Sequence, residues 1–159
     1  MRRAGTEPKK ILIVDPDCTA LDPLVRLLDA NNYIVAMTET VEDAWRSLSA
    51  DPPDLVLLEP MLPSGTEGFH FVWELRDHPD EKLRRTPVLI VSRIHQTMAL
   101  NLFPDFHDGH YQAHEYLPVQ GFIDKPVDHN SLLRAVNSVF VPFQIRGPHA
   151  RRTSFSAQR

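Results

Sequence analysis

Each of four short apolar runs in this chain is followed by residues that can ionise or form hydrogen bonds. A cluster of carboxylates beside an ammonium and a hydroxyl would form a site of coupled charges, and groups of that kind are typical of functional sites. The residues concerned are Asp15 and Asp17 after the first run, then Glu59, Ser92 and Lys125 after later ones. Whether they meet depends on the elements that carry them.

The apolar runs have the length and composition of buried strands. They cover residues 11–14, 33–37, 55–58, 88–91 and 122–123. Continuous runs of Val, Ile and Leu are typical of strands that are covered on both faces, as in a parallel sheet. We therefore expect five strands, with the candidate polar residues at their carboxyl ends.

Helical patterns lie between the runs. Pro23 predicts a first helix that is kinked or that begins late with Asp22 as its cap. Thr40 and Asp128 stand at cap positions before the second and last helices. The third helix is predicted to bury a stripe that comprises Phe69, Val72, Trp73 and Arg76.

The segment from residue 93 to 120 breaks the alternation, because it contains Pro104, Gly109 and Pro118. It predicts a short helix over residues 94–102 and then an extended loop. The alternation elsewhere predicts an α/β fold, a doubly wound five-stranded parallel sheet with a remodelled fourth crossover. In such sheets ligands bind at the carboxyl ends of the strands, which would bring the candidate residues into one cleft.

The chain resembles the response-regulator receiver domain, the CheY-like (βα)5 fold of the flavodoxin-like type, over about residues 9–140. The matching segments are residues 10–15 (KILIVD), 53–59 (PDLVLLE), 61–63 (MLP), 67–69 (EGF), 87–92 (PVLIVS) and 121–126 (GFIDKP). The resemblance implies a module of a two-component phosphorelay. In that family a histidine kinase passes a phosphoryl group to an aspartate, and an acidic pair binds Mg²⁺.

At the acidic positions this chain matches the family pattern only in part. Asp15 matches the first acid of the metal-binding pair, but Pro16 stands where the second acid is expected. Glu59 occupies the position of the phosphoacceptor aspartate. The resemblance therefore implies a degenerate phosphorylation site made of Glu59, Asp15, Pro16, Asp17, Ser92 and Lys125.

Other positions of the family pattern are kept. Ser92 matches the hydroxyl residue and Lys125 the lysine that contact phosphoryl oxygens in the family. Phe122 matches the aromatic switch position, so that the implied switch pair is Ser92 and Phe122. Arg93 stands where the family commonly has a small residue, and the bond from Lys125 to Pro126 is expected to be cis.

These substitutions predict a site that does not accept phosphate. Glutamate is one methylene longer than aspartate, so the Glu59 carboxylate should reach toward Lys125 and Ser92. Pro16 offers no side-chain oxygen, so a hard cation loses a ligand. We expect no cofactor, weakened Mg²⁺ binding and a Glu59–Lys125 ion pair. The predicted role is partner binding and not enzyme catalysis, with Glu59 holding the domain either on or off.

Three alternatives stay open. The site could be inert, or the chain could accept phosphate in a Mg²⁺-dependent reaction at an unusual acceptor such as Asp17. A third alternative is a metal-binding sensor built on His107, His110 and His114, whose spacing places them on one face if the segment is helical.

Charge is distributed unevenly along the chain. The total formal charge is −4, but residues 1–10 carry +3 and residues 142–159 carry +4, which leaves −11 for the body. We predict a flexible basic N-terminus over 1–8, a receiver-like domain over 9–140 and a basic, disordered tail over 141–159. The acidic body argues against nucleic-acid binding.

The partner is expected to be a protein, either a histidine kinase or a downstream effector, with a homodimer as a further alternative. Leu117, Pro118, Val119 and Phe122 are candidates for an apolar contact patch. The apolar runs are too short to span a membrane. Cys18 is the only cysteine, which excludes an internal disulfide, and the expected location is the cytoplasm.

Overall fold

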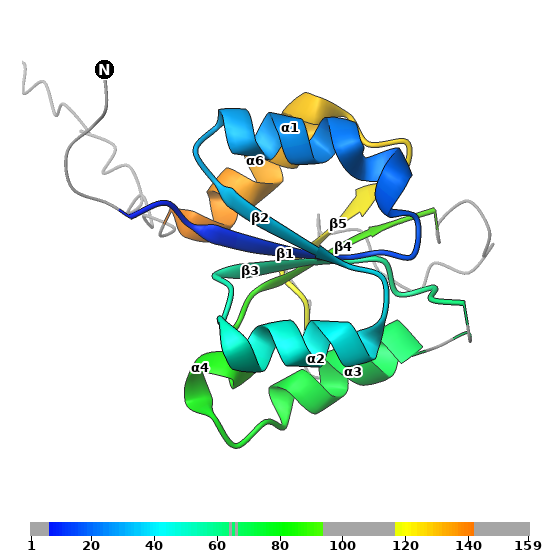
Figure 1. The fold of residues 1–159 in the computed structure, drawn as a ribbon, viewed down its shortest axis with the longest axis vertical. Coiled ribbons are helices and arrows are strands. Elements are labelled where there is room, and N and C mark those ends of the chain that lie inside the picture. Colours follow the sequence, from blue (N-terminus) through cyan, green and yellow to red (C-terminus); the bar gives the residue numbers. More distant parts are fainter. Residues whose placement is uncertain (1–6, 64, 66, 94–116, 142–159) are drawn as a thin grey trace, which may run out of the picture.

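Five parallel strands form one sheet in the order β2-β1-β3-β4-β5 in the computed structural model, as the sequence predicts (Figure 1). The structure describes residues 7–63, 65, 67–93 and 117–141. The strands are β1 (Lys10–Val14), β2 (Ile34–Thr38), β3 (Leu55–Leu58), β4 (Val88–Ser92) and β5 (Gly121–Asp124).

Helices cover both faces of this sheet. A short 3-10 helix, η1 (Cys18–Leu21), leads into α1 (Asp22–Ala30), and α1 lies beside α6 (His129–Phe140) on one face. The opposite face carries α2 (Val41–Ala50), α3 (Glu67–Arg76) and the single turn α4 (Glu81–Arg84). Figure 1 shows the three layers, with the strands passing between the two helical layers.

Alternate residues of each strand point into two separate cores. Ile11, Ile13 and Leu57 pack with α1 and α6, whereas Leu12 and Val14 pack with α2 and α3. Because both faces are covered, every residue of β3 and β4 is buried. This explains why these strands are continuous apolar runs in the sequence and not alternating ones.

The predicted helix caps are confirmed at two of three positions. Thr40 accepts a hydrogen bond from the amide of Asp43 (3.1 Å), and Asp128 accepts one from the amide of Ser131 (2.8 Å). The first helix begins late, as Pro23 predicts, but Asp22 is its first residue and Leu21 is the cap. Asp17 instead caps η1 in front of it, because its carboxylate faces the amide of Ala20.

The stripe predicted on α3 is partly wrong. Val72 is buried and Phe69 packs against the core, as predicted, whereas Trp73 is 45% exposed and Phe71 and Leu75 are buried instead. Apolar residues occupy so many positions of this helix that the sequence does not fix its buried face to within one position. The sequence also gives no signal for the turn α4, since four residues are too few to show a helical period.

The candidate apolar patch is also wrong in part. Leu117 is buried in the core beside α2 and α3, so it cannot contribute to a surface. The helix predicted over 94–102, the three histidines of the alternative metal site and the basic tail lie outside the described residues. Among the described residues, no helix is both long and apolar enough to cross a membrane.

Candidate functional site

Backbone hydrogen bonds carry the sheet pairing one residue beyond several strands and thereby position the candidate residues. The amide of Glu59 donates to the carbonyl of Val14 (2.9 Å), and the amide of Lys125 donates to the carbonyl of Ser92 (3.0 Å). The amide of Asp15 pairs in the same way with β2. As predicted, the ends of β1, β3, β4 and β5 therefore meet at one edge of the sheet.

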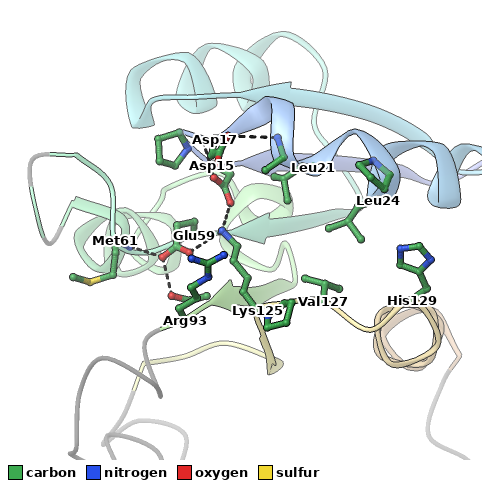
Figure 2. A pocket seen from close by; sticks show the side chains of 15 residues that line it. Asp15, Asp17, Leu21, Leu24, Glu59, Met61, Arg93, Lys125, Val127 and His129 are labelled. Carbon is green, nitrogen blue, oxygen red and sulfur yellow. Dashed lines mark hydrogen bonds and ion pairs between the residues drawn. The ribbon is translucent and has the colours of Figure 1, made fainter.

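Glu59 is the acceptor at the centre of the site. Its Oε1 accepts hydrogen bonds from the Ser92 hydroxyl (2.8 Å) and from the backbone amide of Met61 (3.0 Å). Its Oε2 lies 3.1 Å from the ammonium of Lys125. The Glu59 carboxylate therefore contacts Ser92 and Lys125, as predicted from the sequence (Figure 2).

Lys125 joins two carboxylates. Its Nζ donates to Oδ2 of Asp15 at 2.7 Å in addition to pairing with Glu59. Burial lowers the pKa of Lys125, but the hydrogen bonds and negative charges of Asp15 and Glu59 outweigh it, so the pKa lies above its ordinary value. The ammonium thus stays charged at neutral pH and bridges β1, β3 and β5. The pairing of Lys125 with Glu59 agrees with the prediction from the sequence, whereas the contact of Lys125 with Asp15 was not predicted.

The remaining candidates lie around this network. Asp17 caps η1, and its amide donates to Oδ1 of Asp15 (2.8 Å), while Pro16 adds no side-chain oxygen. Phe122 is half-buried and packs against the core beside α2 and α3. Arg93 is exposed, directly follows β4, and lines the same cavity as Glu59. The bond from Lys125 to Pro126 is cis, as expected.

Gly68 allows α3 to approach the site closely. A Cβ at this position would lie 2.4 Å from the Cα of Pro60 and 2.6 Å from its carbonyl oxygen. Because Pro60 directly follows Glu59, the missing side chain lets the start of α3 pack against the backbone that carries the central carboxylate.

Mg²⁺, the ion that the family pattern implies, would find few carboxylate oxygens here that do not already face a donor. A hard cation needs several oxygen ligands, and Mg²⁺ prefers octahedral geometry. Both carboxylate oxygens of Glu59 and Oδ2 of Asp15 already face hydrogen-bond donors, and Pro16 has no side-chain oxygen that could bind a metal. Within the described residues, no three His, Cys, Asp or Glu side chains are grouped to hold a metal.

A parallel 2-1-3-4-5 sheet with a lysine, a hydroxyl and carboxylates at its carboxyl edge defines a receiver-type α/β signalling domain. The comparison with known families agrees, since the sequence pattern of the Response regulator receiver domain family matches residues 11–104. The chain belongs to this family.

Known relatives and solved structures are consistent with this family. The chain is 28% identical to Protein PilH of Pseudomonas aeruginosa over 130 residues, which are 82% of this chain and 96% of PilH. It is 31% identical to Response regulator MprA of Mycolicibacterium vanbaalenii over 54% of this chain and 35% of that protein. The chemotaxis response regulator CheY4 of Vibrio cholerae has the same fold, with a TM-score of 0.64, 20% identity and coverage of 83% and 98% of the two chains.

Proposed function

We propose that this receiver domain acts by binding a protein partner and does so without a phosphorylation cycle. The observation that supports the proposal is the engagement of Glu59 with Ser92 and Lys125. In the family these two residues contact phosphoryl oxygens. Here the longer carboxylate occupies them, so an incoming phosphoryl group would have to displace it.

The charge balance of the site supports the same proposal. Asp15 and Glu59 carry two negative charges, and Lys125 and Arg93 carry two positive ones. A phosphoacceptor site needs cations to neutralise the transferred group. With Lys125 already paired to two carboxylates, little positive charge remains for that purpose.

The partner class follows from the family, in which receivers interact with histidine kinases or with downstream effectors. We propose that this chain presents one fixed conformation to such a partner, because the network ties four strand ends together. Buried ion pairs of this kind can select a single conformation even where they add little stability. The proposed role is binding without catalysis, and a cytoplasmic location remains a prediction.

The test is the intact mass of the full chain after incubation with phosphoramidate and Mg²⁺. The native protein should gain no phosphoryl adduct, whereas a Glu59→Asp, Pro16→Asp variant should gain one. Glu59→Asp alone separates the effect of the acceptor from that of the missing metal ligand. A phosphoryl adduct on the native chain would overturn the proposal, and peptide mapping would then show whether Asp17 accepts it.

A further inference from the structure

A cavity of about 600 Å³ opens beside the charged network and extends well beyond it. Its volume lies in the range of roughly 300–1,000 Å³ that is usual for small-molecule sites. It also lies at the carboxyl edge of the parallel sheet, where ligands of doubly wound folds bind. The phosphorylation chemistry of the family uses only the charged end.

The rest of the cavity is an apolar trough between two chain segments. Leu21 and Leu24 line one wall, and Val127 lines the wall that leads into α6 (Figure 2). Ala20 and Pro23 extend the first wall. Both leucines belong to the core that packs α1 and α6 on the sheet, so this wall is held firmly in place.

The charged end determines which ligands fit. The carboxylates of Asp15 and Glu59 already accept hydrogen bonds, so they are poor acceptors for a ligand that donates. The lysine and arginine at this end are donors only. With Asp17, which also lines the cavity, three carboxylates face two cations, so the charged side chains sum to −1 and disfavour an anionic ligand.

We propose that this cavity binds a small, uncharged and mainly apolar molecule that carries a hydrogen-bond acceptor such as a carbonyl. Its apolar body lies on the trough of Leu21, Leu24 and Val127, and its acceptor group faces the guanidinium of Arg93, since Lys125 already donates to Asp15 and Glu59. A ligand there contacts η1, the end of β4 and the start of α6, and it needs neither phosphate nor metal.

The dye Prodan, an uncharged naphthalene with a ketone, has this chemistry and fluoresces at shorter wavelength in apolar surroundings. Titration of the full-length native protein into Prodan should give a saturable blue shift. Anilinonaphthalene sulfonate, which has a similar apolar body but carries a negative charge, should bind more weakly. A preference for the sulfonate would overturn the assigned ligand class.

Two pairs of variants locate the bound dye. Ala20→Trp fills the trough from an exposed position, and Ala30→Trp places the same side chain at an exposed position at the end of α1, outside the cavity. Val127→Gln makes the trough polar, and Val139→Gln makes the same change on α6 away from it. The cavity variants should raise the Kd for Prodan roughly tenfold or more, and the control variants should leave it unchanged.

Equal dye affinity in all four variants would place the dye elsewhere and refute the proposal. Thermal unfolding of each variant separates lost binding from lost folding. Sedimentation of native protein and Ala20→Trp provides a further check. If the native chain is a dimer and Ala20→Trp is a monomer, a second copy covers the trough and the small-molecule proposal is wrong.

Discussion

Replacement of Lys125 by methionine tests whether the charged network stabilises the fold. Lys125 is 17% exposed as a side chain, and its partners Asp15 and Glu59 are 3% and 9% exposed. Removal of one partner of a buried ion pair costs about 3–5 kcal/mol, because the other charge is left without compensation. Since Lys125 keeps some contact with water, we expect a loss of about 3 kcal/mol in the free energy of unfolding.

The assay is urea unfolding followed by far-UV circular dichroism. Arg85→Met is the matched control, because Arg85 pairs with Glu81 on the surface at 77% and 63% exposure. That exposed pair should contribute less than about 1 kcal/mol. A loss for Lys125→Met as small as that of the control would refute the structural role of the network.

A double-mutant cycle with Glu59→Gln isolates the contact itself. In the Glu59→Gln background only Asp15 remains unpaired when Lys125 is lost, so Lys125→Met should cost less there. We expect a coupling free energy of at least about 1 kcal/mol between the two positions. Strictly additive losses would mean that the 3.1 Å contact between Lys125 and Glu59 contributes nothing specific.

Three further predictions follow from other parts of the structure. Arg76→Met should lower the free energy of unfolding in urea by about 2–4 kcal/mol, because the Arg76 guanidinium donates to the carbonyls of Pro118 (3.0 Å) and Thr86 (2.7 Å). The control is Arg46→Met, which removes an exposed ion pair and should change the urea midpoint little. Gly68→Ala should destabilise by about 1–3 kcal/mol through its clash with the Pro60 backbone, and an unchanged thermal midpoint would contradict that packing. The pKa of Lys125 in the folded state is raised above its ordinary value of 10.5. The stability that Lys125 contributes should therefore be constant below pH 10.5 and should be lost as the pH rises through the higher pKa of the folded state. Urea midpoints of native protein and Lys125→Met should therefore converge only in alkaline solution, and convergence below pH 10.5 would show that the pKa is not raised.

The strands and the meeting of their polar ends could be predicted because both are local properties of the sequence. Each buried strand is an unbroken apolar run, and the residue after it lies at the carboxyl edge. The alternation with helices then restricts the topology. The contacts of Glu59 with Ser92 and Lys125 could be predicted as well, because the family pattern places these residues together and glutamate is one methylene longer than aspartate. The contact of Lys125 with Asp15 could not be predicted in this way. The bond from Lys125 to Asp15 spans 110 positions and depends on side-chain rotamers that no local pattern specifies.

Two further features could not be predicted from the sequence, namely the complete buried face of α3 and the presence of the apolar trough. The sequence places Val72 on the buried face of α3 correctly, but only the packing against the sheet shows that Phe71 and Leu75 are buried and Trp73 is exposed. No pattern in the sequence distinguishes Leu21, Leu24 and Val127 from other apolar residues. Their role as cavity walls depends on the spacing between η1 and the loop before α6, which is a property of the assembled fold.

The most direct test of the closed site is a calorimetric titration of Mg²⁺ into the native chain, beside the Glu59→Asp, Pro16→Asp variant. Because Lys125 and Glu59 pair with each other at the position that a metal would need, we expect no saturable Mg²⁺ binding by the native protein. We expect clear binding by the variant. Saturable binding by the native protein that is lost in Asp15→Asn would contradict the closed site and restore metal-dependent phosphorylation as the function.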